Sequence, residues 1–470
     1  MWSSSLLLAL LAPMAHSALA EKVLGAYIFA RHGDRTAKAL GNTHLTDLGY
    51  NEVYLTGSYY HTRYISPSSP LQIAGISEPT VNTKQITAST PSDEVLQNSA
   101  TGFLQGVYPP VGNSANETLR NSTTVQSPLH GYQLIPLGTV SSGTNSEDST
   151  WLQKASGCEA ATASSKGFYS SALYDDLLGS TKDFYMSLSP MLSSTFEEAQ
   201  MSFKNAYKIF DYLNVALIHN SSSEFPASEL LTDGVYNQLL TLASTSEYNL
   251  AYNSSDEIRA IEGMSLAGEV LEGLEDIVTS QGKSKLNIQF GSYGTFMSYF
   301  GLAQLPSVNV NFTGIPDYAS SMAWELVTNS TSDAFPAESE INVRFIFHNG
   351  TITGSLTPDQ YPLFGQSSTV IPWSDFVEQT KKIAVTTQDQ WCQACGNTDS
   401  QCPAASVQST SSSGGMSKAV AGVVGAMVTL GVILILEALF FFVGGFTIAK
   451  KRKADTGSEI SSEHVTDKTP

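Results

Sequence analysis

The sequence predicts an α/β fold, in which a sheet core flanked by helices is interrupted by a helical insertion. The first observation is a continuous apolar run at residues 23–30, which is typical of a strand buried on both faces. The second is a change of period, because apolar side chains recur every three to four positions between residues 157 and 282. Short strand-like runs return after residue 285, so the helical block separates two parts of one core.

Each expected element follows from its own pattern. The strand at 23–30 ends on polar residues, and residues 45–64 then carry an apolar pattern of helical length. Further strands are expected at residues 85–88, 134–137, 286–290, 323–327 and 341–347. Within the insertion, helices are expected at residues 166–187, 196–218, 227–242 and 256–281.

Composition limits the class of protein. The chain has 470 residues, 41% hydrophobic and 10% aromatic, which is enough for about two or three folded domains. Lys and Arg number 24 against 43 Asp and Glu, a formal net charge of −19. This charge argues against nucleic acid as a partner, because phosphate backbones are bound by basic surfaces. Only seven basic residues are arginine, so each can be inspected individually.

The two ends of the chain predict export and membrane anchoring. Residues 1–20 hold a short apolar run followed by small residues, which is typical of a signal peptide. Residues 419–449 are apolar, with Glu437 as the one carboxylate, and the basic run 450–453 follows at once. This pattern predicts a transmembrane helix with the N-terminus outside and a cytoplasmic tail at 450–470. The role of Glu437, neutral or paired with a partner helix, stays open.

Sequons and cysteines fit a glycosylated, disulfide-bonded ectodomain. The acceptor asparagines of Asn-x-Ser/Thr are Asn116, Asn121, Asn220, Asn253, Asn311, Asn329 and Asn349. In an exported chain the four cysteines predict disulfides rather than a metal site, and three pairings are open among Cys158, Cys392, Cys395 and Cys402. The expected domains are core residues 21–150, a helical cap at 151–284, core residues 285–390 and a Cys-containing, Ser/Thr/Gly-rich stalk at 391–418.

One cluster of residues has the chemistry of an active site. Arg31-His32-Gly33-Asp34-Arg35 follows the buried strand directly, and ligands of α/β sheets bind at the carboxyl ends of strands. A neutral imidazole can attack phosphorus, and two guanidinium groups can hold the phosphoryl oxygens. Asp34 is a candidate proton donor within the motif. The pattern predicts phosphoryl transfer with His32 as the nucleophile.

These residues resemble the histidine acid phosphatase family, a branch of the histidine phosphatase (phosphoglycerate-mutase-like) superfamily with the signature Arg-His-Gly-x-Arg near its N-terminus. Leu45–Gly49 is similar to the family's Leu-Thr-x-x-Gly segment, and Ser99–Pro110 to its Ser-Ala…Tyr-Pro-Pro helix. The resemblance implies a phosphoglycerate-mutase-like sheet with a cap, and acid phosphatase or phytase-like chemistry through a phosphohistidine on His32. It implies Arg31 and Arg35 as the clamp for phosphate or a phosphomonoester, with no metal or cofactor.

The chain departs from the family pattern at three positions. Ser89 stands where a third phosphate-binding Arg is expected, and Ser292-Tyr293 stand where a His followed by an acid is expected. No Arg lies between Arg63 and Arg120, and no His lies between His219 and His348, so no small shift of alignment restores them. His130 and His348 lie in expected loops and are candidate substitutes. The remaining ectodomain arginines, Arg63, Arg120, Arg259 and Arg344, are expected to form surface ion pairs.

Three functions follow from this sequence. The first is a cell-surface acid phosphatase with an altered proton donor. The second is a pseudophosphatase that binds phosphate or phosphorylated ligands without turnover, because the third Arg and the His-acid pair are missing. The third is an adhesion ectodomain with a relic pocket. The natural ligand and the oligomeric state stay open.

Overall fold

The computed structural model describes residues 21–140, 157–221, 225, 227–354, 356–398 and 402. By internal contacts the chain divides into Met1–Ala405 and Ser406–Pro470, and the described residues all belong to the first unit. The expected signal peptide, most of the stalk, the apolar segment 419–449 with Glu437, and the tail lie outside the described residues. Within the described part of the chain, no helix is both long enough and apolar enough to span a bilayer.

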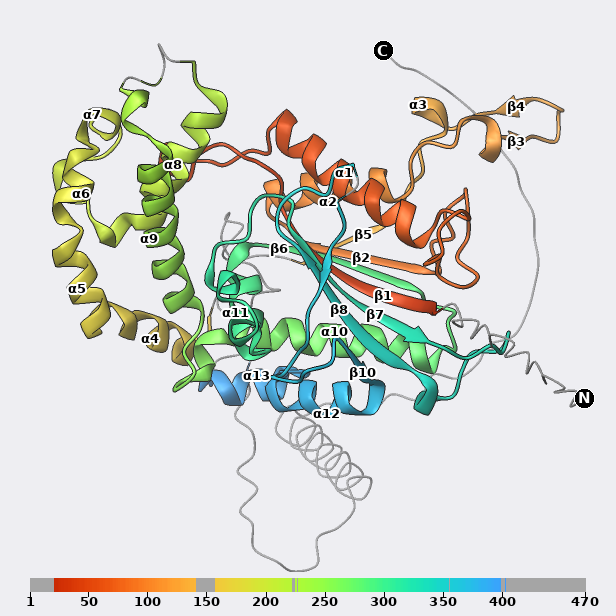
Figure 1. Cartoon of the computed structure of the whole chain (residues 1–470). Helices are drawn as coiled ribbons and strands as arrows, with labels where there is room; N and C mark the ends of the chain where they lie inside the picture. Colours follow the sequence, from red (N-terminus) through yellow and green to blue (C-terminus); the bar gives the residue numbers. More distant parts are fainter. Residues whose placement is uncertain are drawn as a thin grey trace, which may run out of the picture. The chain divides into compact units, whose positions relative to one another are not determined.

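The core is one mixed sheet of eight strands (Figure 1). Its strands are β1 (Lys22–Arg31), β2 (Ile86–Pro91), β5 (Leu137–Val140), β6 (Leu286–Gly291), β7 (Ser321–Thr328), β8 (Asn342–His348), β9 (Asp359–Gln360) and β10 (Val370–Pro372). The order is β10-β8-β7-β1-β6-β2-β5, with β9 beside β8. The strands β1, β6, β2 and β5 run parallel, whereas β7, β8 and β10 are antiparallel additions. The α/β class is confirmed, as are the strands expected at 23–30, 85–88, 286–290, 323–327 and 341–347.

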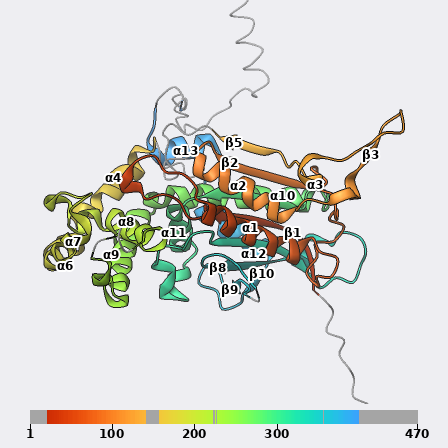
Figure 2. The same cartoon turned by 90° about the horizontal axis from the view of Figure 1, so that it is seen from above.

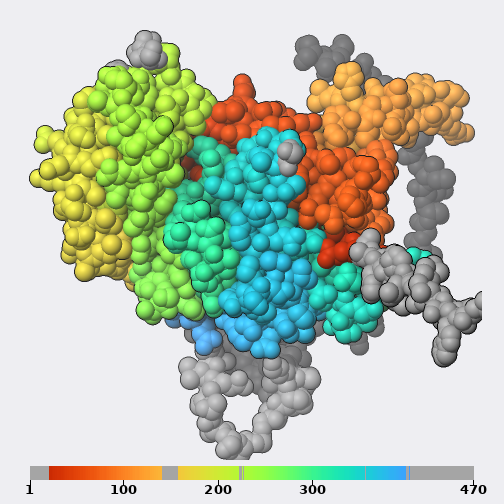
Figure 3. Space-filling view, viewed as in Figure 1, coloured from red at the N-terminus to blue at the C-terminus, as the bar shows by residue number. Residues whose placement is uncertain are grey.

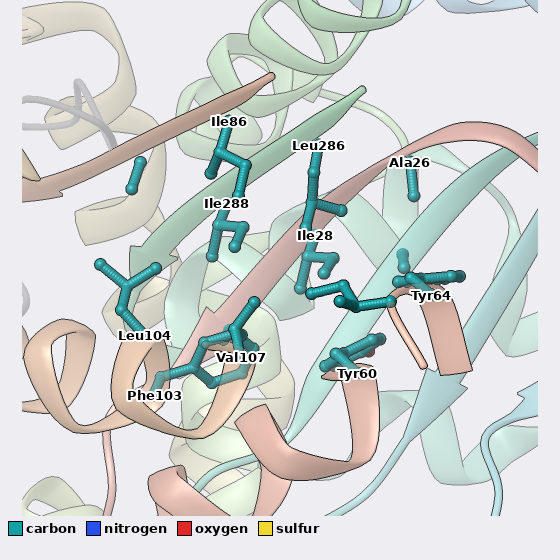
Figure 4. Packing of buried hydrophobic residues seen from close by; sticks show 14 of the residues in the cluster. Ala26, Ile28, Tyr60, Tyr64, Ile86, Phe103, Leu104, Val107, Leu286 and Ile288 are labelled. Carbon is teal, nitrogen blue, oxygen red and sulfur yellow. The ribbon is translucent and has the colours of Figure 1, made fainter. Parts of the chain in front are cut away.

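Helices cover both faces of the sheet (Figure 2). Helices α1 (Asp47–Tyr64) and α2 (Glu94–Val107) pack on one face. Figure 4 shows Ile28, Leu286 and Ile288 of the strands meeting Phe103 and Val107 of α2 there. The other face is covered by α10 (Ile261–Thr279), α11 (Tyr293–Leu302) and α12 (Trp373–Ile383). This two-sided cover explains why β1 is apolar at successive positions rather than at alternate ones.

A helical cap stands beside the sheet and has its own core (Figure 3). Its helices are α4 (Glu159–Gly167), α5 (Ala172–Ser180), α6 (Lys182–Ser187), α7 (Ser189–Leu192), α8 (Ala206–His219) and α9 (Asp233–Ala251). The single helix expected at 166–187 is wrong, because Ser171 caps a new helix by accepting a hydrogen bond from the backbone of Tyr174.

The predicted helix at 256–281 exists as α10, but it belongs to the sheet core rather than to the cap. Leu266, Val270 and Leu274 on its apolar face pack in one cluster with Tyr27 and Phe29 of β1. An amphipathic stripe shows that a helix buries one face without showing which partner covers it.

Residues 112–131 form an arm that projects from the core (Figure 1). It contains the two-stranded ribbon of β3 (Glu117–Thr118) and β4 (Thr124–Val125), followed by the short helix α3 (Pro128–Gly131). His130 is exposed on this arm, so the structure does not bring it to the motif. The strand expected at 134–137 begins only at Leu137, where pairing with β2 starts.

The disulfide Cys158–Cys395 joins the end of the core to the start of the cap, and a second disulfide, Cys392–Cys402, closes a short loop after it. Residues 391–395 are therefore not an extended stalk but the end of α13 (Gln388–Cys395). Thr387 and Gln390 form a capping box at the start of this helix, and Trp391 is buried. None of the seven sequon asparagines is buried.

The expectation of surface ion pairs is wrong for Arg63 and Arg344. Both bind the buried Glu325 of β7, with Nε–carboxylate distances of 2.7 and 2.5 Å. The arginine side chains are 13% and 7% exposed and Glu325 is fully buried, so this cluster is part of the core. It lies level with Ala26, the fifth residue of β1 and five positions before Arg31.

Candidate active site

The motif residues lie where β1 ends in the middle of the sheet. Arg31 is the last residue of β1 and is in register with Gly291, the last residue of β6. His32, Asp34 and Arg35 are fully buried, and Arg31 is 4% exposed. The prediction that the signature stands at the carboxyl edge of a buried parallel strand is confirmed.

Two glycines let the motif pack tightly against α1. A Cβ on Gly33 would lie 2.1 Å from the backbone oxygen of Gly49, and a Cβ on Gly49 would lie 2.0 Å from that of Asp34. Thr46 caps α1 and its hydroxyl also donates to the Asp34 carboxylate at 2.6 Å. The backbones of the Arg-His-Gly and Leu-Thr-x-x-Gly segments therefore pack directly against each other.

His32 is oriented by its own loop. Its Nδ1 lies 2.8 Å from the carbonyl oxygen of Gly33. Because a carbonyl oxygen only accepts, Nδ1 is the donor, and the neutral imidazole then carries its lone pair on Nε2. The Tyr318 ring lies beside it, with 5.7 Å between ring centroids. Nε2 is thus the atom with which this histidine can attack phosphorus.

Both predicted clamp arginines face the Tyr318 ring that also lies beside His32, and each has protein partners. Arg31 donates to the carbonyl oxygen of Pro316, and its guanidinium lies 5.2 Å from the Tyr293 ring centroid and 4.7 Å from that of Tyr318. Arg35 donates to Asp211 of α8 at 2.8 Å, a contact in which both side chains are buried. Arg35 also donates to the Tyr207 hydroxyl at 3.1 Å. The cap therefore supplies an anion to the clamp.

Asp34 is held as a hydrogen-bond acceptor. Besides Thr46, the Nε2 of His219 lies 2.6 Å from its Oδ2. Asp34 is fully buried, whereas His219, the last residue of α8, is 32% exposed. A His–carboxylate pair thus exists next to the nucleophile, although no His in the chain is followed by an acid. No sequence signal reveals it, because its members lie 185 positions apart.

Glu52 of α1 is a second acidic group at the motif. Its carboxylate accepts a hydrogen bond from the backbone N–H of Asp34 at 2.8 Å. Burial raises the pKa of Glu52 from 4.5 to about 7; the Asp34 and Asp317 charges add to this, whereas the Asp34 hydrogen bond and Arg31 oppose it. Glu52 therefore changes charge near neutral pH within reach of the site.

The three divergent positions have structural roles. Ser89 lies inside β2, level with Gln289 of β6 and hence with Phe29, three positions before His32. Ser292 is the buried residue that precedes α11. Tyr293 is buried, and its hydroxyl donates to Glu247 of α9 at 2.9 Å. None of the three replaces the charge or the acid that the family pattern places there.

Lys38 supplies a third cation that the sequence reasoning missed. Its ammonium nitrogen lies 5.2 Å from the Tyr207 ring centroid and 5.7 Å from that of Tyr293, the ring that also faces Arg31. Its backbone N–H donates to Asp211 at 2.8 Å. In the sequence, the one signal for Lys38 is its position three residues after Arg35 in the same loop. Among the described residues, no cluster of His, Cys, Asp and Glu could hold a metal ion.

Two cavities lie where the cap meets the core. The smaller, of about 90 Å³, is lined by Arg31, Asp211 and Tyr318 among others. The larger, of about 640 Å³, runs between α9 and the core segments 309–316 and 347–349. His348 ends β8 level with Ala30 of β1 and lines this larger cavity. In Figure 3 the light-green surface of α9 meets the teal and cyan surface of the core along this boundary.

This signature at the edge of a capped α/β sheet defines a phosphoryl-transfer class of protein, and comparison with family models gives the same answer. The model described as "Histidine phosphatase superfamily (branch 2)" matches residues 37–348, about two thirds of the chain, so the protein belongs to that family. A comparison with curated proteins finds no significant match.

Solved structures of the same fold are distant in sequence. The Klebsiella sp. ASR1 phytase aligns with a TM-score of 0.52 and 11% identity, covering 78% of this chain and 95% of that one. The apo phytase of Hafnia alvei aligns at 0.51 and 11%, covering 80% and 98%. The same Hafnia alvei enzyme in complex with myo-inositol hexakis sulphate aligns at 0.51 and 12%, with the same coverage. These likenesses establish the capped histidine phosphatase fold.

Proposed function

We propose that this protein is a phosphomonoesterase that forms a phosphohistidine on His32. The observation that carries the proposal is the bond between His32 Nδ1 and the Gly33 carbonyl at a buried strand end, which leaves Nε2 to attack, beside the Tyr318 ring that the Arg31 and Arg35 guanidinium groups also face. Membership of the histidine phosphatase family supports it.

The chemistry proceeds in two displacements. The Nε2 lone pair forms a bond to phosphorus as the P–O bond to the alcohol breaks, and water then displaces the phosphoryl group from His32 as inorganic phosphate. The charges of Arg31, Arg35 and Lys38 stabilise the phosphoryl oxygens in both steps. Because Asp211 already binds Arg35, a phosphate must share or replace this carboxylate.

The leaving alkoxide needs a proton, and we assign it to the His219–Asp34 pair. Asp34 holds the imidazole by the 2.6 Å contact with Nε2, and the partial exposure of His219 leaves its ring open to solvent. The His219–Asp34 pair, formed by residues distant in the chain, supplies the proton donor that Ser292 and Tyr293 do not supply.

The test compares an aryl phosphate, whose leaving group needs little protonation, with an alkyl phosphate in the full-length chain. His32→Ala should abolish turnover of both. His219→Ala should lower kcat for the alkyl ester by ~10²-fold or more and affect the aryl ester far less. Equal loss on both esters would remove His219 from the proton-donor role, and aryl phosphatase activity that survives His32→Ala would overturn the mechanism.

A second candidate function is phosphate binding without turnover. It is favoured by the Arg35–Asp211 contact and by the missing third arginine. In that case wild type and His32→Ala are equally inactive, while inorganic phosphate still raises Tm.

We also propose that the protein is exported and held at the cell surface through residues 419–449. Two disulfides and seven unburied sequon asparagines support an oxidising compartment. Surface labelling of intact cells, with sensitivity to N-glycosidase, tests this localisation, and a chain that stays inside unglycosylated would refute it.

A further inference from the structure

The larger cavity bears on the chemical class of the substrate. It shares Leu240, Ile315, Pro316 and Asn349 with the smaller cavity that contains Arg31. It also opens at the same sheet edge as the motif, because His348 is level with Ala30 through β7. A phosphomonoester whose phosphate binds Arg31 therefore has this space of about 640 Å³ beside it for the rest of the molecule.

The lining of this cavity is polar but carries almost no charge. Side chains with hydroxyl or amide groups contribute most of the polar atoms, among them Thr241, Ser244, Asn309 and Thr313. Phe312 and Tyr361 add aromatic faces. Of the described residues that line it, none is Lys or Arg. Hydroxyls, amides and aromatic rings bind polyhydroxy molecules by hydrogen bonds and stacking, whereas several phosphates require several cations.

The charges that are present disfavour a polyanion. Asp359 lines the larger cavity and Asp317 the smaller one, and the chain as a whole carries a net charge of −19. Among the described residues, Arg31 is the one Lys or Arg that lines either cavity, and His348 of the larger cavity is the one other side chain that can carry positive charge. A second or third phosphate on the substrate would face carboxylates rather than guanidinium groups.

We propose that the substrate is a monophosphate ester of an uncharged polyhydroxy body, such as a sugar or cyclitol, and not a multiply phosphorylated ring. The inference rests on the proposed phosphatase function. It separates this site from that of the fold relative seen with myo-inositol hexakis sulphate, a ligand with six anionic groups.

The matched probes are myo-inositol 1-phosphate and myo-inositol hexakisphosphate, which share one ring and differ in the number of phosphates. They are compared with an aryl phosphate on the full-length chain as isolated, and again on an Asn311→Gln, Asn349→Gln variant that cannot carry glycans at the two sequon asparagines lining the cavity. The monophosphate should have a kcat/KM at least ~10-fold above that of the hexakisphosphate. Equal or higher kcat/KM for the hexakisphosphate would overturn the inference.

A pair of matched lysine variants tests whether the larger cavity is responsible for the preference between the two inositol phosphates. Thr241 lines the cavity on α9, is exposed, and donates its hydroxyl to the backbone oxygen four residues earlier at 2.7 Å. Thr101 on α2 is equally exposed, makes the same bond at 2.9 Å, and does not line the cavity. Thr241→Lys should raise the hexakisphosphate-to-monophosphate ratio several-fold, and Thr101→Lys should not. Equal effects of the two variants would contradict the assignment of the cavity.

A binding measurement distinguishes failure of the proposed phosphatase function from failure of the proposed substrate class. If neither wild type nor variants turn over any of the three phosphates, the proposed function fails, and the same comparison is made by thermal shift. A larger rise of Tm with the monophosphate than with the hexakisphosphate then supports the substrate class, and the reverse order overturns it.

Discussion

The contact between Arg35 and Asp211 decides how the candidate site binds an anion. Both side chains are buried, and their atoms lie 2.8 Å apart. Burying a charge is costly unless it is paired, so Asp211 stabilises the clamp while no phosphate is bound. A phosphate that approaches Arg35 competes with a carboxylate that belongs to the protein.

Asp211→Asn should lower the free energy of unfolding by about 3–5 kcal/mol, because it removes the buried carboxylate that pairs with the buried Arg35. Inorganic phosphate should restore part of this loss, so its effect on Tm should be larger in the variant than in wild type. Glu325→Gln is the matched control, since it disrupts a buried ion pair that contains no motif residue. Phosphate rescue of both variants, or of neither, would contradict the role given to Arg35.

Glu52 should make stability depend on pH near neutrality. Its carboxyl pKa is raised from 4.5 to about 7 by burial, so between these values the folded chain binds more protons there than the unfolded chain. The free energy of unfolding therefore falls as pH rises through this range, by up to about 3 kcal/mol. Glu52→Gln keeps an acceptor for the Asp34 N–H and should remove this fall. Denaturant unfolding at pH 5 and pH 8 measures it, and an unchanged pH slope would refute the effect.

Individual residues were predictable from sequence only where they were adjacent in the chain. Arg31, His32 and Arg35 stand together in one motif, and the structure places them together. Asp211 and His219 reach the motif from the cap, where nothing in their helix distinguishes them from other polar positions. The missing third arginine was visible in the sequence, but its nearest substitute, Lys38, required the positions of two aromatic rings.

Helices and strands were predictable where the periodicity of apolar residues was strong. It also mattered that one neighbouring element was enough to bury those residues. The strands of the sheet appear close to their predicted positions, because an apolar strand between two layers needs no further information. The predicted boundary of the cap at 284 differs from the structure, because α10 packs on β1 instead. The expected stalk instead begins with the end of α13, which two disulfides hold. The spacing of the cysteines in the sequence does not determine how they pair.

The disulfide between Cys158 and Cys395 should stabilise the fold more than its neighbour. It closes a separation of 237 residues, against 10 for Cys392–Cys402, and a longer loop loses more entropy on closure. Cys158→Ser with Cys395→Ser should cost about 2–5 kcal/mol. Cys392→Ser with Cys402→Ser should cost less. Thermal unfolding of the two double variants compares them, and the opposite order would show that α13 does not tie the cap to the core.

At the scale of the whole molecule, charge works against the proposed substrate. The net charge of −19 repels an anion at long range, while the buried cations at the motif bind it only at short range. Salt screens the first effect more than the second. We therefore expect kcat/KM for a phosphomonoester to rise a few-fold between low and physiological ionic strength. A fall with added salt would mean that local positive potential governs entry.

The central claim is that His32 becomes phosphorylated even though the chain lacks the third arginine and the sequential His-acid pair. Rapid base quench of the full-length chain with an aryl phosphate, followed by peptide mass spectrometry under non-acidic conditions, measures this directly. We predict a base-stable phosphoryl group on the peptide that contains His32, formed within one turnover and absent from His32→Ala. Turnover with no phosphoryl group on that peptide, or an aryl phosphatase activity unchanged in His32→Ala, would contradict the account.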